Sequence, residues 1–555
     1  MSERTDISGI SIGAIPWLLP LSRLTGPLFD KELRVSSRQR RFYALRFAYV
    51  ALLAIVVSFL WLSVVRSSKT TSAVVWISRM PEAGKQIVMT VLWFQFIAGQ
   101  LLAAVLLSGA IGGEIRQRSL DVLLTTPLSR FQIVVGKLLS KLLQLVLLLA
   151  ISLPLLAIVR VFGGVPWDFV ISGLCITLTA AVFVGSLSLF FSITNRQTHQ
   201  VIMGVLGWCL ILWVGLACVL AALVYANHIT AAQSKVFSEL ISPPVVMMQQ
   251  TRAMLAGQAG SSWRWHCLIM LAMAVVMVTL SIWRLRRARL DAIGASDHQS
   301  PQDRRRWPWR GTIRRVKGAP IVWKELRRPY LPRNRRQFWS LIFSGIAIGV
   351  IVTSLIVLVV AGYMPLAPAA GGAAYLLWLL FVISATSASA AAITREKEAR
   401  TWPILLTTPL DNGEIVRGKA IGALRWNLPL LAPLPILGLV ILLYAFNELS
   451  GAGEAIFFLV GWVFRVLGGL VFLIGMALYM GTRVKTTTVA VVTTFGIYLV
   501  SRMVLSIAAM TAVGVSGAPM VMMLIAGLFQ GFVYVLVGLG ALSAAIGRVR
   551  RDVFA

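Results

Sequence analysis

Residues 114–137 read EIRQRSLDVLLTTPLSRFQIVVGK, and residues 396–419 read EKEARTWPILLTTPLDNGEIVRGK. The two stretches agree at 12 of 24 positions, and the run LLTTPL is identical in both. A second motif, PxxxKELR, occurs at residues 27–34 and again at residues 320–327. Self-similarity at so long a period indicates that the chain consists of two copies of one unit.

Apolar runs long enough to cross a bilayer flank both stretches. About 20 residues of helix span the hydrocarbon core, and a helix satisfies its backbone hydrogen bonds internally where lipid offers no partner. Twelve such runs are predicted, at residues 43–65, 88–110, 140–163, 168–192, 199–226, 264–284, 340–362, 372–394, 422–446, 454–480, 488–513 and 519–547. The fold class is therefore predicted to be an all-α polytopic membrane protein, with about twelve transmembrane helices as two parallel six-helix repeats.

The charge balance supports this prediction and orients the chain. Of 555 residues, 58% are hydrophobic, yet 52 are Lys or Arg against 20 Asp or Glu, a net charge of +32. Only 13% of residues are charged, which argues against a soluble nucleic-acid binder. With the N-terminus inside, 39 cations fall inside, 8 outside and 5 within spans. This bias predicts a multi-pass protein of the cell inner (plasma) membrane, in contact with membrane lipids, with both termini cytoplasmic.

The densest cationic cluster lies between residues 284 and 336 and separates the two units. We expect a first six-helix half with an N-terminal interfacial helix at 1–290, a basic cytoplasmic linker at 291–318 and a second six-helix half at 319–555. The linker is either a solvated loop that enforces topology or a contact for an acidic partner. A weaker third repeat sets residues 194–198 beside residues 482–486, at a spacing of 288.

No catalytic, cofactor-binding or metal site is predicted. The stretch GEIVRGKA at 413–420 matches a phosphate loop except for its last position, where Ala replaces the hydroxyl residue that magnesium requires. No segment outside the spans has room for an ATPase domain. The cysteines form no CxxC pair and the histidines are scattered, at Cys175, Cys209, Cys218, Cys267, His199, His228, His266 and His298.

Charges deep inside the spans are few and all of one sign. No Asp or Glu lies deep inside a predicted span, whereas carriers driven by protons or sodium usually need an intramembrane acid. Arg465 and Arg502 do lie deep, and they are the candidate residues of a substrate path. They either bind an anionic group of the substrate or serve helix packing and snorkelling.

The repeated segment predicts a short helix leaving the membrane, a turn at Pro127 and a second helix that starts near Ser129. Ser129 and its counterpart Asp411 are suitable N-caps. An exposed helix of this kind has few partners in its own chain, so docking into a groove on another protein is favoured.

The motifs taken together resemble the permease subunits of ABC transporters of the ABC-2 exporter class, here as two permease units fused in one chain. The resemblance implies an interfacial elbow helix before the first span of each unit, with Lys31, Glu32, Lys324 and Glu325. It also implies that the LLTTPL loop couples to a separate ABC ATP-binding subunit, in two copies, which holds ATP and magnesium. This chain would hold no cofactor. The implied ATPase-coupling residues are Glu114, Arg118, Thr125, Thr126, Pro127, Glu396, Arg400, Thr407, Thr408 and Pro409.

The predicted function is thus the membrane-spanning permease of an ATP-driven exporter, a transport subunit and not itself an enzyme. An ion-coupled secondary transporter is one alternative, and a non-transporting membrane anchor or sensor that recruits a cytoplasmic partner is another. The halves also differ, since Ser-Leu-Asp at 119–121 is matched by Thr-Trp-Pro at 401–403. The two coupling segments therefore need not bind the ATPase equally.

Overall fold

Helices make up the part of the chain that the computed structural model describes, and this part contains no strand. The described residues are 73–116, 129–160, 165–195, 198–225, 228–258, 260, 263–297, 318–327, 366–435, 438–439, 452–516 and 519–550, with single helical residues between Phe29 and Trp61. The prediction of an all-α polytopic membrane protein is confirmed.

The helices of the first half end near residue 297. They are α3 (Ala73–Ser108), α4 (Gly112–Arg116), α6 (Arg130–Arg160), α7 (Trp167–Thr194), α8 (Thr198–Leu210), the π-helical turn η3 (Ile211–Gly215), α9 (Leu216–Tyr225), α10 (Ala231–Ile241), α11 (Pro243–Ala256) and α12 (Trp263–Asp297). Those of the second half are α13 (Pro320–Leu326), α15 (Leu366–Glu398), α16 (Trp402–Leu406), α17 (Asn412–Leu431), α19 (Ala452–Arg483), α20 (Thr487–Ser516) and α21 (Pro519–Arg548).

Nine of the twelve predicted spans correspond to apolar helices of the structure. Among the described residues, seven helices are long and apolar enough to cross a membrane, and Gln200–Trp213 and Thr487–Arg502 are shorter apolar segments. The predicted spans at 43–65, 340–362 and 422–446 lie wholly or partly outside the described residues, although α17 covers the start of the last. The predicted span 199–226 contains a π-helical turn in its middle.

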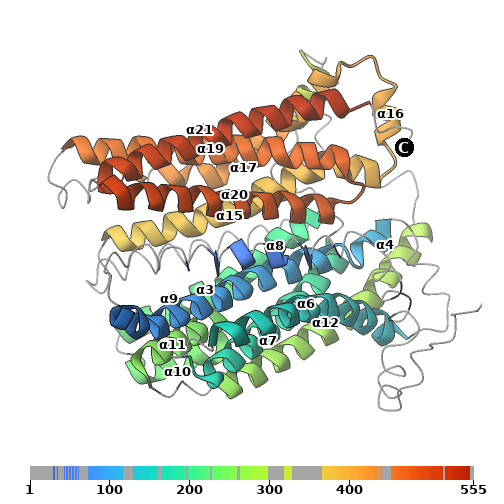
Figure 1. The fold of residues 1–555 in the computed structure, drawn as a ribbon. Coiled ribbons are helices and arrows are strands. Elements are labelled where there is room, and N and C mark those ends of the chain that lie inside the picture. The colour runs from blue at the N-terminus through green and yellow to red at the C-terminus, as the bar shows by residue number, and fades with distance from the viewer. Residues whose placement is uncertain are drawn as a thin grey trace, which may run out of the picture.

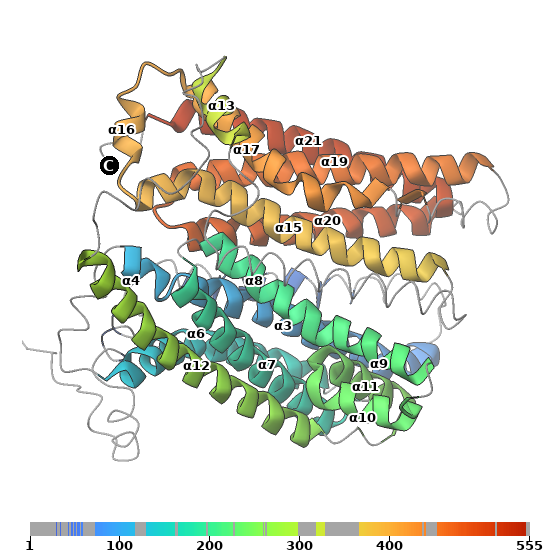
Figure 2. The ribbon, with the colours of Figure 1, turned by 180° about the vertical axis from the view of Figure 1, so that it is seen from behind.

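The two ends of the helix bundle carry different elements (Figures 1 and 2). The short helices α4 and α16 lie at one end, together with the last turn of α21, and we call this the α16 end. The helices α10 and α11 lie at the other end, which we call the α10 end. Because α4 and α16 follow corresponding spans, their common location is what two parallel repeats require.

Matching helices pack in the same way within each half. In the first half α7 contacts α3 and α12, and in the second half α19 contacts α15 and α21. The halves meet where α8 contacts α15 and where α3 contacts α20. A buried cluster closes this junction, with Val105 and Ile202 from the first half against Ile383, Ala477 and Ala490 from the second.

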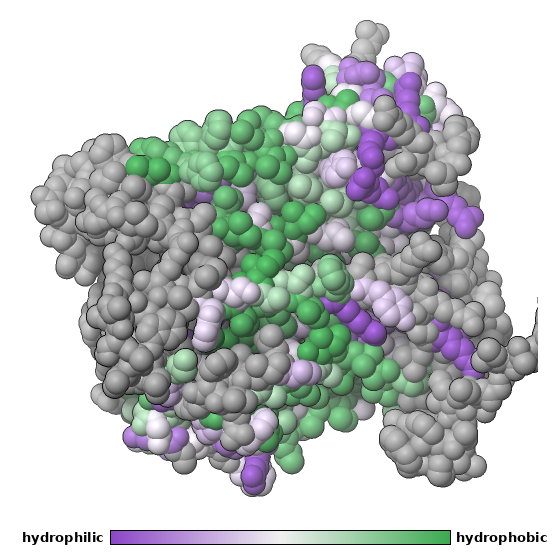
Figure 3. Space-filling model, in the orientation of Figure 1, coloured by the Kyte–Doolittle hydropathy of each residue, from purple (hydrophilic) through white to green (hydrophobic). Residues whose placement is uncertain are grey.

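Apolar side chains also cover the outside of the bundle. On α21, Phe529, Phe532 and Leu536 are all more than half exposed, and Figure 3 shows the apolar surface over this helix. Polar residues gather near α16 instead (Figure 3). An exposed apolar face of this length suits lipid and not water.

Glycines bring α19 and α21 into backbone contact. A Cβ atom at Gly475 would lie 2.1 Å from the carbonyl oxygen of Gly538, and one at Gly468 would lie 2.4 Å from that of Gly531. No side chain fits at these distances, so the glycines are required for the close approach. The spacing of seven residues on both helices keeps the contact on one face of each.

Candidate functional site

The repeated segment of the second half starts with a capped helix end. After α15 ends at Glu398, the amide of Thr401 donates to the carbonyl of Glu396 at 2.9 Å, and the amide of Arg400 donates to that of Lys397 at 3.1 Å. These two bonds are those of a Schellman cap, in which the residue at the Arg400 position is left-handed. Arg400 has a φ of 57°, a conformation that favours glycine.

The predicted order of short helix, turn and second helix is confirmed in this half. The helix α16 has five residues and is followed by the turn at Thr407–Pro409, after which α17 begins. The N-cap of α17 is Asp411, whose carboxylate accepts from the amide of Gly413 at 2.9 Å. In the first half Ser129 caps α6, because its hydroxyl accepts from the Gln132 amide at 3.1 Å while the Gln132 side chain accepts from the Ser129 amide.

One tryptophan anchors α16 to the bundle. Trp402 is 6% exposed and packs in a cluster with Ile321, Ile415 and Val549. The opposite face of α16 points outward, and Ile404 on it is 68% exposed. Thr407 and Pro409 are exposed as well. Trp402 thus anchors the segment to the bundle, while Ile404 presents an apolar side chain at the α16 end.

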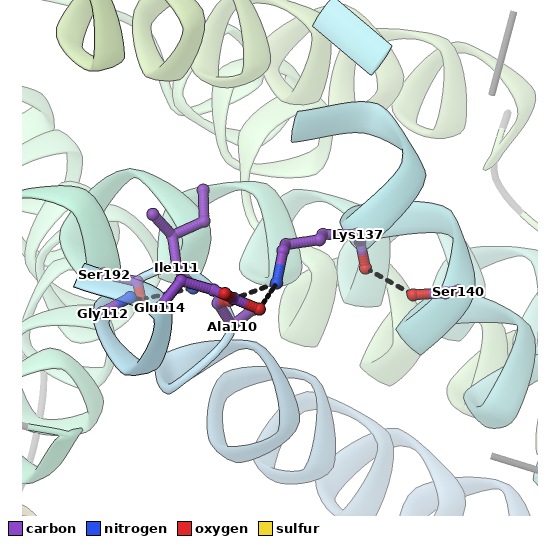
Figure 4. Close-up of polar contacts among 7 residues, drawn as sticks. All are labelled: Ala110, Ile111, Gly112, Glu114, Lys137, Ser140 and Ser192. Atoms are coloured by element: carbon purple, nitrogen blue, oxygen red, sulfur yellow. Dashed lines mark hydrogen bonds and ion pairs between the residues drawn. The ribbon is translucent and has the colours of Figure 1, made fainter. Parts of the chain in front are cut away.

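Each half ties its repeated glutamate to its repeated lysine. Lys137 donates to Glu114 at 2.8 Å, and Lys419 donates to Glu396 at 2.5 Å. Both lysines are almost completely buried, with 3% and 5% exposure. Figure 4 shows the first pair, in which the Lys137 ammonium also donates to the carbonyl of Ala110 at 2.9 Å. These ion pairs join the end of one span to the beginning of the next, on either side of the coupling segment.

In the second half the elbow helix joins this ion pair. Glu325 on α13 accepts from the Lys419 ammonium at 3.3 Å, and its backbone carbonyl accepts from Arg425 at 2.8 Å. Two glycines of α17 allow α13 to lie so close (Figure 2). A Cβ at Gly418 would lie 2.6 Å from Ile321, and one at Gly422 would lie 2.9 Å from the Glu325 side chain.

The end of α15 also holds the beginning of α20. The Glu398 carboxylate accepts from the amide of Thr487 at 2.8 Å, and the hydroxyls of Thr394 and Thr487 are 2.8 Å apart. The Lys397 ammonium donates to the carbonyl of Thr482. Movement of α16 would therefore act on α15, α17 and α20 together.

The structure brings some predicted residues together and places others elsewhere. Glu325 and Glu396 share Lys419, whereas Arg400, Thr407 and Pro409 are exposed beside them. Lys31 and Lys324 are helical residues, and Lys31 is exposed. The predicted residues Glu32, Arg118, Thr125, Thr126 and Pro127 lie outside the described residues, and Arg465 and Arg502 lie in the middle of the bundle.

Sequence reasoning assigned no role to Lys137, Lys419 or Trp402. The signal for the lysines was present, because glutamate and lysine are 23 residues apart in both copies of the repeat. Trp402 carried no such signal, since its counterpart in the first half is Leu120.

A protein-family model described as ABC-2 family transporter protein matches residues 27–290 and 354–525. The chain belongs to this family. The two matched regions agree with two fused permease units, and ABC-2 membership with the apolar helices identifies a membrane-spanning permease component. ABC-2 permeases lack the ATPase domain and generally work with an ATP-binding subunit. A search of curated proteins finds no match to the chain.

Proposed function

We propose that this ABC-2 permease works as an exporter driven by ATP, and that α16 and its counterpart in the first half dock on two copies of a separate ABC ATP-binding subunit. The exposed Ile404 on an anchored helix at the α16 end is the observation that carries the proposal. An apolar side chain on a short projecting helix fits a groove on a partner protein. ATP and magnesium bind the partner, which hydrolyses the nucleotide.

Arg400 supports the same proposal. A residue other than glycine in the left-handed conformation costs roughly 1 to 3 kcal/mol, and such strain is concentrated at functional sites. The Arg400 side chain is exposed, so packing does not explain why arginine stands at this cap. Arg118 holds the matching place in the first repeat. Both arginines would bind carboxylates of the ATP-binding subunit.

The distribution of cations supports a cytoplasmic location of the α16 end. Cations at or near this end include Arg417, Arg483, Lys485, Arg548 and Arg550, whereas Lys235, Arg252 and Arg264 lie toward the α10 end. Cytoplasmic loops carry the excess of lysine and arginine. Both termini would then be cytoplasmic and the membrane would be the cell inner membrane.

The contacts of the site suggest how ATP would drive transport. Closure of the ATPase dimer would push on the two coupling segments, and the ion pairs of Lys137 and Lys419 would pass the movement to the spans on either side. In the described residues the halves meet mainly along α8, α15, α3 and α20, so they would change their relative position as rigid units. The cavity between them would open alternately to the two sides.

Replacing Ile404 with aspartate tests the proposal. The full chain is co-purified with the ATP-binding subunit encoded beside it, and ATP hydrolysis is measured. Ile404→Asp should abolish binding, because the charge would enter an apolar groove. The matched control is Val236→Asp, which alters a residue of similar exposure (55%) at the α10 end. Unchanged binding and hydrolysis in Ile404→Asp would refute docking through α16, whereas failure of the unaltered chain to bind the ATP-binding subunit would favour a membrane anchor or an ion-coupled carrier.

A further inference from the structure

Two arginines lie half-way along the helices of the second half. Arg465 stands 13 residues after the first residue of α19, and Arg502 stands 15 residues after that of α20. At 1.5 Å per residue these positions are about 20 Å from the helix ends. Charged side chains at such depth are expensive, and they usually face a protein interior or a water-filled path.

The two guanidinium groups belong to one cluster. Their charges are close enough to interact, and Tyr498 and Tyr534 are near Arg465 as well. Arg502 lies near Tyr498, whose hydroxyl accepts from the indole N–H of Trp378 at 3.1 Å. Arg465 reaches toward α21, since one of its terminal nitrogens lies 3.0 Å from where a Cβ of Gly527 would be. The cluster thus involves α15, α19, α20 and α21.

The cluster contains no negative charge in the described residues. The sequences of α20 and α21 have no Asp or Glu, and those of α15 and α19 have Glu396, Glu398 and Glu454 near their ends. Glu454 is 11 residues from Arg465, about 16 Å along the helix. The Nε atom of Arg465 is buried and has no hydrogen-bond partner in the described part of the chain. A buried donor without a partner is rare and calls for one.

The pair is not part of the repeated framework. At the spacing of 288 residues, the first half has Thr177 where the second has Arg465, and Val214 where it has Arg502. A device that only held the helices together would be expected in both halves. The arginines therefore indicate a function that the second half performs and the first half does not.

We propose that Arg465 and Arg502 bind an oxyanion, a phosphate or carboxylate group, of the molecule that this permease moves; the proposal rests on the transport function above. Guanidinium groups present planar pairs of donors that match such groups, and they do so more strongly where water is excluded. The hydroxyls of Tyr498 and Tyr534 add two donors. The ring of Trp378, which is only partly buried, offers an apolar surface for the remainder of the molecule.

A free anion and the headgroup of an anionic lipid share this chemistry, so the experiment has an arm for each. The purified full chain, without any ATPase, is reconstituted in phosphatidylcholine nanodiscs, and its thermal unfolding is followed as phosphate or succinate is added. A parallel series replaces part of the phosphatidylcholine with phosphatidylglycerol. Stabilisation by the soluble anions assigns the site to a water-soluble substrate, and stabilisation by phosphatidylglycerol alone assigns it to a lipid.

Arg465→Gln and Arg502→Gln should each weaken the binding that causes this stabilisation about tenfold or more, as expected when a hydrogen bond to a charged group is lost. The matched controls are Arg483→Gln and Arg548→Gln, whose guanidinium groups stack on Tyr479 near the α16 end. Tyr498→Phe provides a smaller change if a glutamine variant does not fold. The proposal is overturned if no probe stabilises the chain, or if the variants and controls respond alike. Loss of ATPase coupling would not affect this assay.

Discussion

Replacing Lys419 with methionine should destabilise the second half, and the matching change at Lys137 should destabilise the first. The Lys419 ammonium lies between two carboxylates, 3.3 Å from Glu325 and 2.5 Å from Glu396, whose side chains are only 12% and 19% exposed. Methionine fills the same volume but leaves both carboxylates without their cation. Breaking a buried ion pair in this way costs roughly 3 to 5 kcal/mol, and we expect about 3 because the carboxylates keep some water.

The first half provides the comparison. Lys137 pairs with Glu114, whose side chain is 27% exposed. Lys137→Met also breaks a buried ion pair, so it should cost about 3 kcal/mol as well. Arg417→Met is the control on the same helix as Lys419, since Arg417 is exposed. A change at such a surface position is usually within about 0.5 kcal/mol.

Unfolding of the purified chain by sodium dodecyl sulfate in mixed micelles, followed by tryptophan fluorescence, measures these differences. Lys419→Met and Lys137→Met should both destabilise the chain well beyond Arg417→Met. Glu396→Gln should destabilise the chain less than Lys419→Met does, because Lys419 still pairs with Glu325 in that variant. If Lys419→Met were no worse than Arg417→Met, the lysine would not hold α13, α15 and α17 together, and the route proposed for movement would be wrong.

Two further predictions concern the backbone. Gly475→Ala should prevent correct packing of α19 on α21, at a cost of at least about 3 kcal/mol, because the new Cβ would lie 2.1 Å from the Gly538 carbonyl oxygen. The control is Gly540→Ala, because nothing lies within 4 Å of the Cβ that it adds. Equal amounts of folded protein from both variants would contradict the prediction. Arg400→Gly should raise the free energy of unfolding by about 1 kcal/mol, because glycine adopts the left-handed conformation freely. The same substitution should weaken binding of the ATP-binding subunit. A variant that gains stability and keeps full binding would show that the Arg400 guanidinium has no role in that binding.

The positions of most helices and the helix caps next to the repeated segment could be predicted from the sequence. Span length follows from bilayer thickness, and the caps at Ser129 and Asp411 follow from side-chain chemistry within three residues, so both are local properties. The 23-residue spacing of Glu396 and Lys419 also recurs in the sequence, but the spacing alone does not show which way the Glu396 carboxylate points. Whether that group faces a partner or its own chain depends on how two spans cross, which is a tertiary property.

Other features could not be predicted for the same reason. The segment 226–262 contains two helices, and Met247 and Met254 on α11 are buried although the segment reads as a loop. Glycine is frequent in α19 and α21, but its frequency does not show which glycines meet the opposite helix. Their role becomes visible only when the carbonyl of the opposite helix is in place.

Fusion of the two units has a physical consequence for the middle of the membrane. In a symmetric dimer of single units every substitution appears twice across the axis, so a pair of arginines would become four at similar depth. Each such charge costs about 2.5 to 3.5 kcal/mol on insertion scales, and the repulsion among four would add to that cost. A fused chain can place Arg465 and Arg502 in one half and keep Thr177 and Val214 in the other. The ion pairs of Lys137 and Lys419 occur in both halves, as the proposed response of both segments to one movement requires, whereas the arginine pair occurs in one half.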